Sequence, residues 1–156
     1  MEELFSARGI DPARVQARLE KAAGEVGLPF GKRGKTYNSR LAQELGKWAE
    51  SMGKGDAFHD AVFRACLVDG ENISMGSVLA GLAGSLGLPE NEAEEVLETR
   101  AFKEHVDLDW ARSRTMRIKV APTMIINEKM LVGAQKYKKM ERFLRENDVK
   151  KSNAES

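Results

Sequence analysis

Hydrophobic residues in the first 116 positions recur every three or four residues, and this spacing predicts a series of amphipathic helices. The first helix is predicted to begin at Asp11 as N-cap, with Pro12 in its first turn, and to stop at Gly27. Asn38 and Ser74 are the expected N-caps of later helices, Pro89 opens another, and one more is expected over residues 101–116. The expected buried positions of the first four helices are Val15, Leu19, Ala22 and Val26; Leu41, Leu45, Trp48 and Met52; Phe58, Ala61, Val62, Ala65 and Cys66; and Val78, Leu79, Leu82 and Leu86.

The periodicity changes in "IKVAPTMIINEKMLVGAQ", residues 118–135, where β-branched and apolar residues replace helical spacing. Two short strands are predicted, at 123–127 and 130–133, joined by a tight hairpin around "NEK". A last helix is expected over residues 135–146, followed by a frayed polar tail. The order is therefore helices, a hairpin and a final helix.

The predicted hairpin is incomplete as a sheet. A two-stranded hairpin is marginally stable in water unless further strands or a helix cover it. The apolar run in "TMIIN" predicts a strand buried on both faces, and such a strand needs neighbours on both edges. This chain supplies one neighbour.

Charge and composition narrow the classes of partner. The chain has 25 basic and 24 acidic residues, a net charge of +1, so its overall charge favours neither nucleic acid nor an anionic membrane as a partner. The longest apolar runs fall short of the roughly 20 residues that span a bilayer, and the acidic N-terminus does not read as a signal peptide. With one cysteine, Cys66, the chain forms no internal disulfide. The expected compartment is the cytoplasm.

"VAPTMIINEKMLVGAQ" resembles the C-terminal half of a thioredoxin fold, in which a cis-proline loop leads into a hairpin and a final helix. The matching positions are Pro122, Thr123, Ile125, Ile126, Gly133, Ala134 and Gln135. Upstream, "NSRLA", "FHDAVFRACLVDGENIS", "VLAGLAGSLGL" and "HVDLDWA" resemble the helical domain inserted in DsbA-like proteins. The branch most similar is the FrnE-like group, related to the 2-hydroxychromene-2-carboxylate isomerases.

The resemblance implies an α/β thioredoxin-like fold of the DsbA type with a helical insertion, of which this chain holds the mostly helical part. The expected divisions are a helical insertion domain with a leading helix at 1–117, the C-terminal half of a thioredoxin fold at 118–147, and a disordered tail at 148–156. In the family, a strand, a CxxC motif (a serine in the isomerases) and a second strand precede these parts. The expectation is therefore a truncated form or part of a longer protein, without the catalytic residues.

The resemblance also assigns a substrate-binding loop to Val120, Ala121, Pro122 and Thr123, with the bond before Pro122 cis. Backbone groups of such a loop pair with an extended substrate as an added strand, beside a thiolate whose pKa a helix N-terminus lowers. The expected partner is thus a protein or peptide thiol or disulfide.

For the other residues that could take part in catalysis or in metal or phosphate binding, a structural role is the better interpretation. Cys66 has no second cysteine to resolve a mixed disulfide and is expected in the core, and His59, seven residues earlier, supplies too few ligands for a metal site. His105, beside Asp107 and Asp109, is expected on the surface. The remaining assignments are that "GKRGKT" at 31–36 lacks the first glycine of a P-loop, that "ENEAEE" at 90–95 is a solvated helix start, and that Trp48 and Trp110 are packing residues.

Three functions stay open. The first is a DsbA/FrnE-like thiol–disulfide oxidoreductase that keeps the cis-proline loop and lacks CxxC in this chain. A sister alternative is a glutathione-dependent isomerase or kappa-type transferase. The third is a non-catalytic binding or chaperone-like module, whose sheet a partner strand or a second copy of the chain completes. Glutathione is the cofactor of the second alternative, and no metal is expected.

Overall fold

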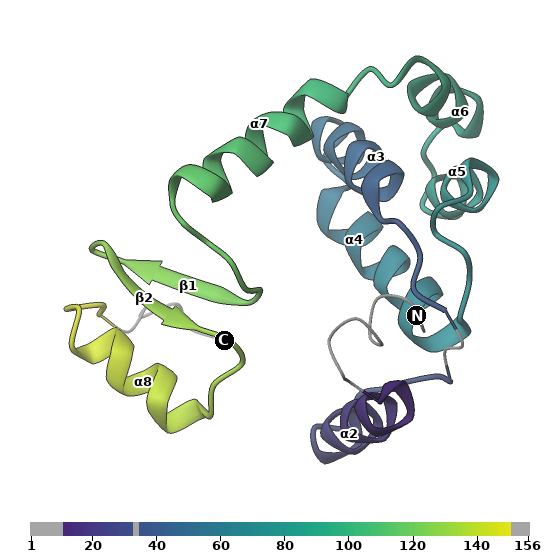
Figure 1. Ribbon diagram of the computed structural model, residues 1–156. Coiled ribbons are helices and arrows are strands. Elements are labelled where there is room, and N and C mark those ends of the chain that lie inside the picture. The colour runs from purple at the N-terminus through teal and green to yellow at the C-terminus, as the bar shows by residue number, and fades with distance from the viewer. Residues whose placement is uncertain (1–10, 33–34, 151–156) are drawn as a thin grey trace. The chain divides into compact units, whose positions relative to one another are not determined.

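The computed structural model describes residues 11–32 and 35–150, most of them helical, with one two-stranded sheet towards the C-terminal end (Figure 1). The elements in chain order are α2 (Pro12–Glu25), α3 (Arg40–Ser51), α4 (Gly55–Arg64), the π-helix η1 (Ala65–Asp69), α5 (Gly76–Ser85), α6 (Glu90–Thr99), α7 (Lys103–Thr115), β1 (Thr123–Ile126), β2 (Lys129–Val132) and α8 (Tyr137–Arg145). The chain forms two compact units, Met1–Asp107 and Leu108–Ser156, and the boundary falls inside α7. None of the helices in the described part is both long and apolar enough to cross a bilayer.

The core of the first unit lies among α3, α4, α5 and α6. Leu45, Phe58 and Leu79 are fully buried there, and Trp48 is almost so. These four positions confirm the buried faces that the helical periodicity predicted. The loops between these helices are short, and they allow neighbouring helices to pack side by side.

The predicted buried faces are wrong at the C-terminal ends of two helices. Val26 is 68% exposed and Met52 is 46% exposed, although both were expected to be buried. Each is the C-cap residue of its helix, α2 and α3 respectively, so each lies past the last turn that faces the core. Ala22 is exposed as well, and the face of α2 is buried only in part.

Two of the predicted caps are wrong by one residue, while a third is confirmed. Asp11 caps α2, because its Oδ1 accepts a hydrogen bond from the Ala13 N–H at 3.0 Å. The N-cap positions of α3 and α5 are Ser39 and Met75, not Asn38 and Ser74. The Asn38 side chain instead accepts from the Arg40 N–H at 2.9 Å, a local turn that comes just before the cap.

The third predicted helix changes its hydrogen-bonding pattern halfway. After Arg64 the α-helix α4 continues as η1, and Gly70 ends it with a φ of +73°. The backbone of Gly31 packs directly on η1, with its N–H donating to the Leu67 carbonyl at 2.8 Å. A Cβ at position 31 would lie 1.9 Å from the Val68 carbonyl oxygen, so the close approach requires glycine.

In the second unit, β1 and β2 pair antiparallel with Thr123 opposite Val132, and Figure 1 shows α8 lying along one face of this hairpin. The two-residue turn uses Asn127 and Glu128 at φ of +48° and +65°, which matches the right-handed twist of the strands. The prediction of a β1 strand buried on both faces is wrong: all four of its residues are half-buried, and among the described residues β2 is its single neighbour. Within the part of the chain that the structure describes, the other edge of β1 pairs with no strand.

The predicted domain boundary after residue 117, the C-terminal half at 118–147 and the disordered tail at 148–156 stay predictions. Residues 151–156 of that tail lie outside the described residues, as do the N-terminal residues 1–10.

Candidate functional site

The predicted substrate-binding loop is accessible. Val120, Ala121 and Pro122 are exposed, and Thr123, the first residue of β1, is half-buried. The peptide bond between Ala121 and Pro122 is cis. The loop therefore presents backbone groups to solvent immediately before the open edge of β1.

Short hydrogen bonds hold the loop against the end of the hairpin. The Thr123 hydroxyl donates to the Val120 carbonyl at 2.5 Å and closes the loop on itself. The Gly133 N–H donates to the Pro122 carbonyl at 2.8 Å, which places the exit of β2 beside the loop. Gly133 has a φ of +78°, a conformation that favours glycine, and this explains why a glycine stands at this point of the "GAQ" motif.

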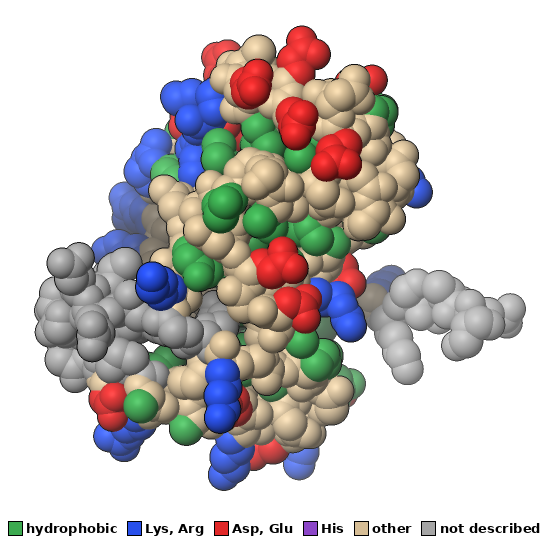
Figure 2. All heavy atoms as spheres, turned by 90° about the vertical axis from the view of Figure 1, so that its right-hand side faces the viewer, with side chains coloured by type: hydrophobic (Ala, Val, Ile, Leu, Met, Phe, Trp, Pro, Cys, Tyr) green, Lys and Arg blue, Asp and Glu red, His purple; other side chains and the backbone are tan. Residues whose placement is uncertain are grey.

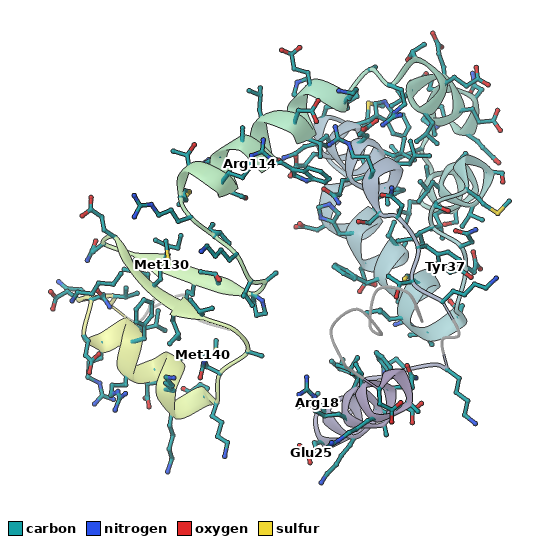
Figure 3. All side chains as sticks on the ribbon, in the orientation of Figure 1. Arg18, Glu25, Tyr37, Arg114, Met130 and Met140 are labelled. Carbon is teal, nitrogen blue, oxygen red and sulfur yellow. The ribbon has the colours of Figure 1, made fainter. Side chains whose placement is uncertain are left out.

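A cavity of about 240 Å³ lies beside Pro122. Its other lining residues come from the hairpin, from the segment after it and from α8: Met124, Leu131, Gly133, Ala134, Gln135 and Met140. The lining is mostly apolar, and in Figure 3 Met140 lies on the side of α8 that faces the hairpin. The cavity is smaller than the roughly 300–1,000 Å³ of typical small-molecule sites, and its size suits one apolar side chain.

The opposite face of the hairpin is apolar and uncovered within this unit. Met130 and Val132 are 42% and 48% exposed, and Ile125 of β1 lies opposite Met130 on the same face. Met130 lies on the side of the hairpin away from α8 in Figure 3. This face and the open edge of β1 are the surfaces on which the small sheet lacks partners among the described residues.

A second cavity, of about 420 Å³, lies in the first unit, and both His59 and Cys66 line it. The remaining lining residues are Tyr37, Ser39, Ala42, Gln43, Val62, Phe63, Leu67 and Ile73. Cys66 packs against the core cluster, as predicted, but it is half-buried rather than enclosed. Among the described residues, no group of three or more His, Cys, Asp or Glu side chains could hold a metal ion.

The sequence analysis did not predict one buried carboxylate of the first unit, that of Glu44 on α3. Glu44 is 1% exposed and accepts hydrogen bonds from Arg100 at 2.7 Å and from Arg40 at 2.5 Å. Hydrogen bonding to Arg100 is the main cause that lowers the pKa of Glu44, and the Arg40 hydrogen bond adds to it against the cost of burial. The feature of the sequence that could have predicted this buried carboxylate is the position of Glu44 beside Leu45, on the otherwise apolar face of α3.

Asp107, one of the two carboxylates near His105, belongs to the same ionic cluster as Glu44. Asp107 accepts from Lys103 at 2.6 Å and from Arg40 at 2.7 Å, and both bonds, that of Lys103 first, lower the pKa of Asp107. His105 is exposed, as predicted, and its ring lies 5.1 Å from the ring of Phe102.

Three further assignments have mixed outcomes. Trp48 is buried, as expected of a packing residue, whereas Trp110 is 45% exposed. The acidic stretch 90–95 begins α6, with Glu90 and Glu92 in its first turn, where the helix dipole favours negative charge. Two residues of "GKRGKT", at positions 33 and 34, lie outside the described residues.

The fold and the loop together define a class of protein, and comparison with known proteins agrees. The model of the DSBA-like thioredoxin domain matches residues 5–145, so the chain belongs to the DsbA-like thioredoxin family. Both the predicted family and the predicted fold class, thioredoxin-like with helices and a C-terminal hairpin, are confirmed.

Among solved structures, the chain is similar to a selenomethionine form of 2-hydroxychromene-2-carboxylate isomerase. The two share 22% sequence identity with a TM-score of 0.73, over 86% of this chain and 68% of that one. At this identity the likeness shows the fold. A comparison with curated proteins found no match.

Proposed function

We propose that this chain supplies the peptide-binding part of a thiol–disulfide oxidoreductase of the DsbA-like family. The observation that carries the proposal is the exposed loop at residues 120–122, tied to the hairpin by the Gly133–Pro122 hydrogen bond and followed by the open edge of β1. An extended peptide pairs with such an edge through alternating N–H and C=O groups. One of its side chains would enter the cavity beside Pro122.

The thiol chemistry needs a reagent from outside this sequence. The one cysteine here, Cys66, lies in the helical unit and has no second cysteine to resolve a mixed disulfide. In the reducing direction, a CxxC thiolate would attack one sulfur of the substrate disulfide, and the other sulfur would leave as a thiolate. The second CxxC thiol would then displace the first substrate sulfur, so that the CxxC is oxidised as the substrate is reduced.

Backbone resonances of the loop provide the test. Titration of the full ¹⁵N-labelled chain with an uncharged extended peptide of about ten residues should shift the amide signals of Val120, Ala121 and Thr123. Thr123→Val removes the hydroxyl that closes the loop and should weaken binding, while Thr123→Ser keeps that hydroxyl and serves as the control. Shifts confined to the cavity around His59 and Cys66 would overturn the proposal. A parallel titration with glutathione tests the isomerase-like alternative.

The open edge also favours a second candidate, a non-catalytic module that completes its sheet with a partner strand. β1 has one strand neighbour among the described residues, and Met130 and Val132 leave the outer face of the hairpin apolar. An unpaired edge with an apolar face is a template for strand addition. Sedimentation of the chain alone distinguishes the candidates: a concentration-dependent dimer that Met130→Lys abolishes supports strand pairing between copies, and a stable monomer contradicts that form of it.

A further inference from the structure

Charge is strongly divided along the chain, although the total is close to zero. Residues 1–107 hold thirteen basic and eighteen acidic residues, a net charge of −5, while residues 108–156 hold twelve basic and six acidic residues, a net charge of +6. Acidic side chains gather over α6, in the upper part of the view in Figure 2. The unit with the candidate peptide-binding loop is thus the basic one.

Most of the basic side chains of this unit have no acidic partner within it. On α8, Arg142 and Arg145 each form an ion pair one turn away on the same helix, with Glu146 and Glu141 at 3.6 Å. Nine other basic residues are exposed and form no ion pair with any described residue: Arg112, Arg114, Arg117, Lys119, Lys129, Lys136, Lys138, Lys139 and Lys150. Their charges are available to a partner.

The helix dipole accounts for some of these basic residues, but not for the lysines that follow the hairpin. Arg112 and Arg114 lie in the last turn of α7, where the helix dipole favours positive charge. Lys136, Lys138 and Lys139 lie at the opposite kind of position, the start of α8, which has no acidic residue in its first turn. A positive charge there is disfavoured by the same dipole. The positions of these lysines therefore oppose the electrostatic preference of their own helix.

Exposed lysines flank the loop and the cavity-lining segment along the chain. Lys119 directly precedes Val120 in the loop. On the other side, Gly133 is bonded to Pro122, Gln135 lines the cavity, and Lys136 follows it as the N-cap of α8. A peptide that places one side chain in the cavity would thus have Lys119 near one flank and Lys136 near the other.

We propose that this loop selects extended acidic peptides, in which one apolar side chain fills the cavity beside Pro122 and acidic residues on either side face Lys119 and Lys136. The proposal rests on the peptide-binding function proposed above and names its substrate class. A polypeptide fits better than a nucleic acid, because the strand edge offers alternating backbone donors and acceptors at peptide spacing and the cavity beside it is apolar. Charge complementarity of this kind sets partner choice more than it sets the total affinity.

The test compares three peptides of about ten residues with the same central leucine and flanks of glutamate, glutamine or lysine. Affinity for the full chain is measured by anisotropy of an uncharged dye, at about 0.05 M and about 0.5 M salt. The acidic peptide should bind about tenfold more tightly than the glutamine peptide at low salt, and the difference should largely vanish at high salt. The lysine peptide should bind least.

Two matched variants locate the effect. Lys119→Gln with Lys136→Gln should reduce affinity for the acidic peptide about fivefold and leave the glutamine peptide unchanged. Arg142→Gln with Arg145→Gln removes the same amount of charge from ion-paired positions and should change the preference little. Circular dichroism of both exposed-residue variants checks that the fold is retained.

The outcomes separate this inference from the function on which it rests. Equal binding of all three peptides, or tightest binding of the lysine peptide, overturns the acidic preference and leaves peptide binding intact. If no peptide binds, the proposed function fails, and the preference fails with it. A single-stranded oligonucleotide that binds more tightly than the acidic peptide would assign the basic residues to nucleic acid and overturn the inference.

Discussion

Arg100 holds both oxygens of the Glu44 carboxylate, through Nε to Oε2 and Nη2 to Oε1, each at 2.7 Å. Arg100 is the C-cap residue of α6, in a left-handed conformation with a φ of +56°, and Glu44 lies on the buried face of α3. The pair therefore fastens the end of α6 to α3. Arg40 links the same carboxylate to Asp107 on α7.

Removing the buried charge should destabilise the helical unit. Glu44→Gln removes the negative charge shared by the two guanidinium groups and replaces one acceptor oxygen with an NH2 donor, and we expect the free energy of unfolding to fall by about 2 kcal/mol, less than for a fully enclosed pair because Arg100 is partly exposed. Urea denaturation followed by circular dichroism measures the change. Glu50→Gln removes a solvent-exposed partner of Lys47 and should change stability by less than about 0.5 kcal/mol. Equal effects of the two variants would contradict a stabilising role for the Glu44 cluster.

Stability should fall in acid because of the same carboxylate. The pKa of Glu44 is lower in the folded chain than in the unfolded chain, chiefly through the Arg100 hydrogen bonds. At pH values between these two pKa values, the unfolded state therefore binds more protons than the folded state. This stabilisation is present above the unfolded value of about 4.3 and is lost as the pH falls through the folded value. Asp107, whose pKa is also lowered, acts in the same direction.

Unfolding in urea between about pH 7 and about pH 3 tests this linkage. The stability gap between the unmodified chain and Glu44→Gln should be largest at neutral pH and should narrow below about pH 4. A gap that stays constant over the whole range would show that Glu44 does not titrate with a lowered pKa.

A methyl group at position 31 should disrupt the contact with the π-helix. Gly31→Ala places a Cβ 1.9 Å from the Val68 carbonyl oxygen and must displace backbone, so we expect a loss of about 1–3 kcal/mol. The Gln16 side chain, which donates to the Gly31 carbonyl at 2.9 Å, would lose its partner in the same shift. Gly24→Ala is the control: nothing lies within 4 Å of its added Cβ on α2, and it should stabilise the helix by up to about 1 kcal/mol. Thermal unfolding of both variants decides the sign.

The hairpin turn offers a stabilising substitution. Glu128 has a φ of +65°, which costs a residue with a side chain about 1 kcal/mol more than glycine. Glu128→Gly should therefore raise the stability of the second unit by about 0.5–1 kcal/mol, measured by amide exchange in β1 and β2. Lys129→Gly, one residue later in β2, should lower it, because glycine weakens a strand. Faster exchange in Glu128→Gly would contradict the assigned turn.

The start of α2, the core positions and the hairpin turn are the elements that the sequence predicted correctly. Asp11 and Pro12 marked the start of α2, and helical spacing identified Leu45, Phe58 and Leu79 as core. Asn127 lies in the hairpin turn that its sequence predicted. The errors fall at helix ends: the sequence predicts Asn38 and Ser74 as caps, whereas their neighbours Ser39 and Met75 hold those positions. Short polar side chains bond the backbone both in caps and in the turns before them, so the sequence alone leaves that choice open.

The sequence by itself determined the helices, the hairpin, the family and the loop at residues 120–123, because periodicity, turn residues and motif order depend on residues close together in the chain. Only the tertiary structure decided that Arg100 neutralises Glu44 across 56 positions, that Gly31 lies against Val68, and that a cavity opens beside Pro122. These contacts join segments distant in sequence, and their geometry is set by how the helices and the hairpin pack.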